Sequence, residues 1–361
     1  MPKRYDFRDA ALVLLVMSIL SIPLHGQESA DKDFQFDLTG GTSASCPSPE
    51  LYSVERPDPP GVPTRVGVGL FFEDIFELRD TEQTFTADVW LALRWRDPRL
   101  ADPSRGDAWA KCEPPSNAVW MPKFRIRNLR EVKQEEDDIV LIDAEGYVLL
   151  FRSMHLTIFS PLDLREFPFD RQVLSLTVAS LLGSDEVVFE VLESLVGQQQ
   201  EASVTSWTLS APQARIENRY GKVSRINVTD FTCDIEARRE PEFFTRKLII
   251  PLTLIVFMAW AIFWIKPAMT APQMGVGTTA MLTLIAYHFA LSGFLPRISY
   301  LTRADSFLLW SMILVFTALM EAIATAAFVN YGKEELAAKM DKVFRAAYPL
   351  AFLLIIAVAI F

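Results

Sequence analysis

Residues 84–96 read TFTADVWLALRWR, a run in which apolar and polar side chains alternate. A period of two residues predicts a β-strand that buries one face. Trp95 belongs to the apolar face and Trp90 to the opposite face. Because a tryptophan on the solvent side of a strand requires a partner surface, Trp90 indicates a subunit interface. The apolar set of this run comprises Phe85, Ala87, Val89, Leu91, Leu93 and Trp95.

Shorter runs on either side repeat the pattern. Apolar residues alternate in 66–72 and again in 174–178, and turn-forming clusters such as Asp97-Pro98 separate the runs. Neither an internal repeat nor a strand–helix–strand pattern is present. We therefore expect an all-β sandwich over residues 27–242, preceded at 43–63 by an irregular, proline-rich lead-in.

The last third of the chain has a different composition. Residues 243–361 hold 14 charged side chains in 119 positions, and residues 248–265 hold none. Apolar stretches of this length predict an all-α membrane domain of four helices. The expected spans are about 244–265, 272–295, 306–329 and 344–361, with a link of about 15 residues between the third and the fourth.

Basic residues indicate the orientation of these spans. The link after the first span carries Lys266, and the link after the third carries three lysines and Arg345. Both links then lie in the cytoplasm by the positive-inside tendency. We expect a multi-pass protein of the cell (inner) membrane, with the N-terminal domain and the C-terminus on the extracellular or periplasmic side.

The first 26 residues have the features of a signal peptide. Lys3, Arg4 and Arg8 precede an apolar segment at 10–22, and the small residue Gly26 offers a cleavage point. A retained anchor is the alternative. Export would place the following domain in an oxidising compartment.

Few residues are available for a disulfide or a metal. Cys46, Cys112 and Cys233 allow at most one internal disulfide, and the sequence does not choose the pair. After residue 26 only His155 and His288 remain, without metal-ligand spacing. We expect neither a metal site nor a cofactor.

Charge excludes several classes of protein. Residues 27–242 sum to −15 and residues 243–361 to +4, within a total of −10. This division excludes a single soluble globule, and the abundance of aromatic residues excludes a disordered chain. The sequence has no dominant basic patch, which argues against a nucleic-acid-binding protein. An enzyme is not expected, because we find no nucleophile or metal signature and Glu321 has no evident acidic partner within the spans.

One face of the second span carries a functional pattern. Its residues recur at steps of 4, 3, 4, 3 and 4 and therefore share one side of a helix. The face is small and polar at its inner end and apolar in its middle. A ring of such helices would form a pore with an apolar constriction that gates by dewetting; the alternative is a small-residue packing face. The residues are Gly275, Thr279, Leu282, Ala286, Phe289 and Gly293.

Five short motifs follow one another along the chain. Each is weak alone, but together and in order they are specific. They are Trp90-Leu91-(x)3-Trp95-x-Asp97-x-x-Leu100, Trp120-x-Pro122, Phe167-Pro168-Phe169-Asp170-x-Gln172, Arg238-Arg239-x-Pro241-x-Phe243-Phe244 and Leu295-Pro296-Arg297-x-x-Tyr300.

This series resembles the pentameric ligand-gated ion channels, the Cys-loop receptor superfamily, over roughly residues 65–361. Two departures are evident. The name-giving loop cysteines would fall at Ser160 and Leu174, and the link after the third span is too short for a large intracellular domain. Both departures resemble the prokaryotic branch of the family.

The resemblance implies a homopentamer with ligand sites between subunits. The central aromatic of one ligand loop is replaced by Leu181, so an aromatic cage for a quaternary amine is incomplete. Two arginines near aromatic residues suit a carboxylate better; the alternative for both is a solvated strand face. The implied ligand-binding residues are Trp90, Arg125, Arg127, Leu181 and Tyr220.

The resemblance also implies a junction that couples the two domains. Asp170 would pair with Arg239, residues 296–303 would lie beneath the loop that contains Asp170, and residues 77–81 would press on them. Loss of such a partly buried pair would leave a charge without its partner. The implied coupling residues are Phe167, Pro168, Phe169, Asp170, Arg239, Pro296 and Arg297.

Two ionisable residues lie at membrane depth. Glu321 is in the middle of the third span and His288 is beside the predicted pore face. Either can make gating pH-dependent; the alternative is a hydrogen-bonded packing residue. The expected stimulus is therefore protons or a small amine or carboxylate.

Ion selectivity has conflicting signals. The inner mouth, residues 271–275, carries no ring of charge, and the run 275–279 resembles anion-selective relatives. Five outer domains, however, would carry about −75 and concentrate cations. We expect a channel for monovalent cations, with an anion channel as the alternative. A membrane-anchored binding receptor is a second class, but it would need a cytoplasmic output domain.

Overall fold

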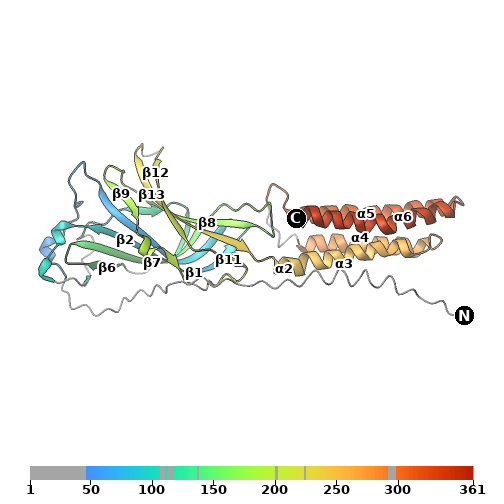
Figure 1. Ribbon diagram of the computed structural model, residues 1–361, viewed down its shortest axis with the longest axis horizontal. Coiled ribbons are helices and arrows are strands. Elements are labelled where there is room, and N and C mark those ends of the chain that lie inside the picture. Colours follow the sequence, from blue (N-terminus) through green and yellow to red (C-terminus); the bar gives the residue numbers. More distant parts are fainter. Residues whose placement is uncertain are drawn as a thin grey trace. The chain divides into compact units, whose positions relative to one another are not determined.

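The computed structural model describes residues 46–105, 110–112, 118–135, 138–199, 202–222, 225–291 and 298–360. The predicted signal peptide and three predicted site residues, Gly293, Pro296 and Arg297, lie outside the described residues. The described chain divides into strands up to Arg239 and four long helical segments after it (Figure 1).

The strands form two sheets. In the larger sheet the order is β10-β1-β2-β7-β6-β3, with β5 on β7 and β9 on β1; in the smaller it is β11-β13-β8-β4, with β12 on β13. The strands are β1 (Thr64–Arg79), β2 (Thr84–Arg96), β3 (Ala110–Cys112), β4 (Phe124–Ile126), β5 (Leu129–Glu135), β6 (Ile139–Ile142), β7 (Tyr147–Phe159), β8 (Arg171–Ser180), β9 (Val187–Val191), β10 (Gly197–Gln198), β11 (Trp207–Leu209), β12 (Gln213–Tyr220) and β13 (Asn227–Arg239).

The core of the sandwich confirms the alternation in residues 84–96. All six residues of the predicted apolar face are at most 1% exposed. Trp95 packs edge-on against Trp120, with ring centroids 5.9 Å apart. Burial of a large apolar side chain contributes about 1.5–3 kcal/mol, so this face is a main source of stability for the sandwich.

The opposite face of β2 is more covered than the alternation indicates. Ala92, Leu149, Phe151 and Leu192 form a second, smaller buried cluster there, and Trp90 packs at its edge. The Trp90 indole N–H donates to Glu73 Oε2 at 3.0 Å. Part of the partner surface that Trp90 requires is therefore supplied by its own chain.

A disulfide joins Cys46 to Cys112, which decides the pairing that the sequence left open. Cys233 is free and buried within β13. The bridge connects the proline-rich lead-in to β3 at the edge of the larger sheet.

Four helical segments follow β13. The first comprises α2 (Glu242–Phe244), a π-helical turn (Thr245–Ile249), α3 (Ile250–Trp260) and a 3-10 turn (Ala261–Trp264). The others are α4 (Thr270–Leu291), α5 (Arg303–Asn330) and α6 (Glu334–Ile360). Among the described residues, three segments are long and apolar enough to cross a membrane: Glu242–Trp264, α4 and α5. The fourth predicted span, within α6, stays a prediction.

The helix α6 begins within the expected link of about 15 residues, ahead of the predicted fourth span. The helices α5 and α6 are separated only by residues 331–333, and Gly332 takes a left-handed φ of 71° at this turn. Glu334 and Glu335 occupy the first turn of α6, where the helix dipole favours acidic side chains. Of the basic residues in this link, Lys339, Lys342 and Arg345 lie on α6, and Lys333 lies in the turn before it.

Candidate functional site

The helix α4 has two faces of different character. The five described residues of the predicted pore face, Gly275, Thr279, Leu282, Ala286 and Phe289, are all exposed in the single chain. Leu282 is 62% exposed and Phe289 is 71% exposed. His288 is also exposed, and its ring lies 6.1 Å from that of Phe289.

The opposite face of α4 makes the contacts within the chain. It contains Gln273, Gly277, Ala280, Leu284 and Leu291, all buried. A Cβ at Gly277 would lie 2.9 Å from Leu319 Cδ1, so a larger residue here would require the Leu319 side chain of α5 to move. The small-residue packing face of the second span is thus a different face from the one that the sequence analysis assigned to a pore.

A hydroxyl group of α4 completes the hydrogen bonding of the first segment. Pro251 has no N–H, so the carbonyl of Lys247, four residues earlier, lacks its helical donor. The Tyr287 hydroxyl donates to the Lys247 carbonyl, and it lies 3.2 Å from the carbonyl oxygen of Leu248. The π-helical turn at Thr245–Ile249 is therefore joined to α4 through a polar contact.

The predicted pair at the domain junction is present. Arg239 Nε donates to Asp170 Oδ1 at 2.7 Å, and Arg239 Nη2 donates to Asp80 Oδ1 at 2.8 Å. Asp80 belongs to the segment 77–81, which the sequence analysis expected to press on residues 296–303 and which here contacts Arg239. Burial lowers the pKa of Arg239, but the hydrogen bonds that its guanidinium donates to Asp170 and Asp80 outweigh this effect and raise the pKa above its usual value. Gln172 Nε2 also donates to Asp170, at 2.6 Å.

Aromatic rings enclose the Arg239 guanidinium. Its central carbon lies 4.1 Å from the ring centroid of Trp207, 4.8 Å from that of Phe167 and 5.7 Å from that of Phe244. Phe167 and Phe244 also contact each other edge-on at 4.7 Å. Pro168 is buried and Phe169 is half-buried in the same loop. Trp207 on β11 was not identified from the sequence, because no local pattern links it to Arg239.

The start of α5 contacts the loop that contains Asp170. The N–H of Arg303 donates to the Arg165 carbonyl at 3.0 Å, and the N–H of Ala304 donates to the Phe167 carbonyl at 3.2 Å. Tyr300 Oη accepts from the Leu164 N–H at 3.0 Å. These contacts confirm, for residues 300–304, that the connection between the second and third spans lies against this loop.

The candidate ligand residues lie on both sheets. Arg125 and Arg127 flank the end of β4, Leu181 follows β8, and Tyr220 ends β12; these three strands belong to the smaller sheet. Leu181 is 50% exposed and Tyr220 is 57% exposed. Trp90 belongs to β2 of the larger sheet, on the other side of the sandwich division from these four.

The two arginines have different surroundings. Arg127 Nη1 lies 2.5 Å from Asp230 Oδ2, and Arg219 Nε lies 2.8 Å from the same oxygen. Asp230 is fully buried, so it holds Arg127 against β13. Arg125 is exposed and makes no ion pair among the described residues. Arg125 is therefore the better candidate for a ligand contact.

Glu321 has an acidic partner that lies outside the expected spans. Asp341 of α6 lies within hydrogen-bonding distance of Glu321 of α5, and both are buried. The sequence analysis missed Asp341 because it assigned this residue to a solvent-exposed link.

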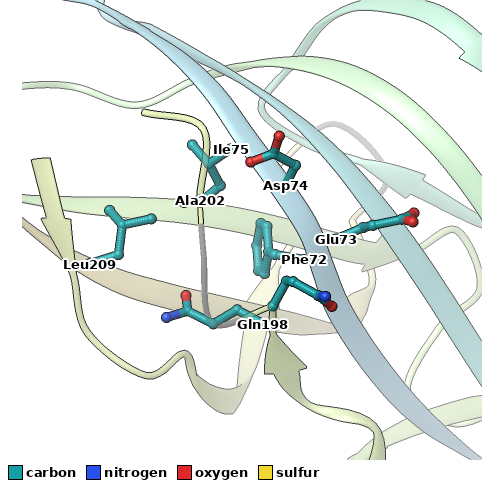
Figure 2. Close-up of a pocket in the computed structure, with 8 residues that line it drawn as sticks. Phe72, Glu73, Asp74, Ile75, Gln198, Ala202 and Leu209 are labelled. Carbon is teal, nitrogen blue, oxygen red and sulfur yellow. The ribbon is translucent and has the colours of Figure 1, made fainter. Parts of the chain in front are cut away.

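A small pocket lies beside the strand β1. It has an empty volume of about 170 Å³ and is shown in Figure 2 with Phe72, Asp74, Gln198 and Leu209 among its lining residues. The predicted ligand residues do not line it. We assign it no function.

Two family models match this chain. Residues 50–241 match the neurotransmitter-gated ion-channel ligand binding domain, and residues 248–349 match the neurotransmitter-gated ion-channel transmembrane region. A proton-gated ion channel of Gloeobacter violaceus is 24% identical over 316 residues, which are 85% of this chain and 86% of that protein. The glycine receptor subunit beta of Rattus norvegicus is 27% identical over 295 residues, which are 77% of this chain and 58% of that protein.

Proposed function

The chain belongs to the neurotransmitter-gated ion channel family, and we propose that it assembles as a homopentamer in which five α4 helices line an ion-conducting pore. Members of this family are multi-pass ligand-gated channels and not enzymes. The observation that carries the pore assignment is the division of α4. Its face at Gly275, Thr279, Leu282, Ala286 and Phe289 is exposed in one subunit, whereas its opposite face packs within the subunit.

The pore face has a graded chemistry. Thr279 would supply hydroxyl groups to ions near the inner end, and rings of Leu282 and Phe289 would form apolar constrictions that exclude water when narrow. Gly293, which lies outside the described residues, would extend this face outward. In this proposal residues 27–242 are the extracellular or periplasmic domain, residues 243–361 cross the membrane four times, and residues 1–26 are the signal peptide.

Protons or a small ligand would open the pore from the subunit interfaces. The similarity to a proton-gated channel supports protons as the stimulus. For a small carboxylate, Arg125 would provide the charge, with Leu181 and Tyr220 beside it and Trp90 on the neighbouring subunit. Arg127 would stabilise the conformation of the ligand site through its ion pair with Asp230. Ligand binding would then shift a closed–open equilibrium of the α4 ring.

The proposed permeant ions are monovalent cations. The charge of −15 on each outer domain supports this choice, because acidic vestibules concentrate cations. An anion-selective channel of the same architecture is the alternative, supported by the resemblance of the run 275–279 to anion-selective relatives. A binding receptor without conduction is the third candidate.

Voltage-clamp recording of cells that express the chain tests these proposals. External pH is stepped from about 4 to about 9, a range that spans carboxylate and histidine titration, and small amines and carboxylates follow. We expect a current whose reversal potential shifts with the cation gradient. A shift with the chloride gradient would select the anion alternative. No current to any stimulus, with pentamers at the cell surface, would favour a receptor without conduction.

Cysteine accessibility tests the pore face itself. The wild-type chain should react little with a thiol reagent, because two of its three cysteines form a disulfide and the third is buried. Thr279→Cys should become blocked by a charged thiol reagent during stimulation. The control Ala280→Cys lies on the buried face and should stay unmodified. Equal modification of both would contradict the assignment of the pore face.

A further inference from the structure

Three polar side chains meet inside the helical segments, one from each of α4, α5 and α6. They are Gln273, Glu321 and Asp341, and none is more than 4% exposed. The Glu321 carboxyl group contacts the Asp341 carboxyl group within hydrogen-bonding distance, and the Gln273 amide contacts Asp341. Two carboxyl groups and one amide are thus buried together.

These groups lack hydrogen-bond donors. All four carboxyl oxygens of Glu321 and Asp341, and also Gln273 Oε1, are without a hydrogen-bond partner in the described part of the chain. The Gln273 Nε2 group donates to the Ile265 carbonyl at 3.1 Å. The nearby Thr325 hydroxyl donates to backbone carbonyls of α5. Buried acceptors without donors are costly, so this arrangement requires a further hydrogen atom.

The charged side chains around Glu321 and Asp341 do not supply the missing hydrogen-bond donor. Arg345 is the cation whose charge acts on Asp341, but its Nε donates to the Phe263 carbonyl at 2.7 Å and its guanidinium stacks on Trp264. The lysines on the neighbouring turns are exposed, and within the described part of the chain they make no ion pair with Glu321 or Asp341. They are Lys266, Lys339 and Lys342.

Carboxylate chemistry then decides the state of the pair. An ionised carboxylate only accepts hydrogen bonds, so two carboxyl groups can bond to each other only if one of them is protonated. Two adjacent buried carboxylates also cannot both ionise without strong repulsion. We propose that Glu321 and Asp341 form a proton-binding site, in which one proton is shared between them and the remaining single negative charge faces Arg345.

The site has a consequence for gating, which rests on the proposed channel function. Loss of the shared proton would place a second negative charge between α5 and α6. The repulsion would be transmitted to Gln273 in the first turns of α4, at the inner end of the predicted pore. This site is therefore a second proton-responsive element, separate from the interfaces between outer domains.

Infrared difference spectroscopy of the purified full-length protein tests the site without any current. A protonated carboxylic acid has a carbonyl band that ionised carboxylates lack and that shifts on deuterium exchange. At neutral pH we expect this band in the difference between wild type and the double variant Glu321→Gln/Asp341→Asn. The control Glu335→Gln alters an exposed acid of the same helix α6 and should leave the band unchanged.

Two results would overturn the proposal: no protonated-acid band in the wild-type protein at neutral pH, or a band that persists at full intensity in the double variant. If the double variant does not fold, the wild-type spectrum still decides, because an absent band excludes the shared proton. A protein that shows the band but conducts no ions would instead contradict the channel function and not this site.

Discussion

Arg239 Nε lies 2.7 Å from Asp170 Oδ1, and neither side chain is more than 4% exposed. The two residues are 69 positions apart, one at the end of β13 and the other just before β8. The same guanidinium reaches Asp80 after β1. A single side chain therefore joins three segments of the sandwich immediately before the first membrane segment.

Asp170→Ala should abolish assembly or current. Removal of one member of a buried ion pair leaves the other charge desolvated, at a cost of about 3–5 kcal/mol. Surface labelling measures assembly, and whole-cell recording measures current. The matched control Asp163→Ala removes an exposed ion pair with Arg165 from the same loop and should have little effect. Wild-type currents from Asp170→Ala would refute a coupling role for this pair.

Leu282→Ala should make the channel easier to open. A smaller apolar ring dewets less readily. Because burial of a leucine side chain contributes about 1.5–3 kcal/mol, the stimulus concentration at half-activation should fall by roughly tenfold or more. Leu254→Ala makes the same truncation at an exposed position of α3 and should leave the midpoint in place. An unchanged midpoint in Leu282→Ala with normal surface expression would count against the constriction.

Tyr287→Phe should weaken the contact between α4 and the first membrane segment. The variant keeps the ring but loses the hydroxyl that serves the carbonyls of Lys247 and Leu248. A hydrogen bond of this kind contributes about 1 kcal/mol, so the open–closed equilibrium should shift several-fold. Tyr331→Phe, at a fully exposed turn after α5, is the control. Identical gating of both variants would exclude the contact from the transition.

Reduction of the Cys46–Cys112 disulfide should destabilise the outer domain. The bridge closes a loop with a sequence separation of 66 residues, for which loop entropy predicts about 4 kcal/mol. Thermal unfolding is measured with and without reductant. Reductant should not further lower the unfolding temperature of the double variant Cys46→Ser/Cys112→Ser. An oxidised and a reduced protein of equal stability would show that the bridge is not formed.

Cys233 should resist alkylation in the folded protein and should reduce stability at alkaline pH. Burial raises the pKa of this thiol from 9.0 to about 12. Between these values the unfolded chain loses the thiol proton and the folded chain keeps it, so the free energy of unfolding should fall as pH rises above about 9. Cys233→Ala should remove this part of the loss. Rapid modification by iodoacetamide at pH about 8 without denaturant would contradict the burial, since exposed thiols titrate near that pH.

Local patterns predicted the elements well where a strong period was present. The alternation in residues 84–96 predicted both the bounds of β2 and the burial of Trp95, because a strand with one buried face needs nothing beyond its own periodicity. The apolar runs likewise predicted three of the four helical segments. The run of charges before the fourth was interpreted as a link between spans, and α6 begins within it at Glu334, since charged residues are compatible with an exposed helix turn.

The ordered motifs in the sequence identified the two residues of the junction pair. They did not predict the geometry of the contact. The motifs indicated that Asp170 and Arg239 meet, but only the pairing of β11 with β13 brings Trp207 beside the same guanidinium, and Asp80 reaches it from the end of β1 in the other sheet. Arg127 and Asp230 were not linked by any local signal, because their contact depends on how β4 and β13 lie on either side of β8.

The sequence by itself determined the division into an acidic β domain and an apolar helical domain, because composition and short-range periodicity specify which surfaces must be buried. It also indicated the face of α4 whose described residues are exposed in the single chain. Only the tertiary structure decided that Cys46 pairs with Cys112, that Tyr287 serves the carbonyl of Lys247, and that Asp341 faces Glu321. Each of these contacts joins residues distant along the chain, and packing and register, which no local window contains, determine which atoms meet.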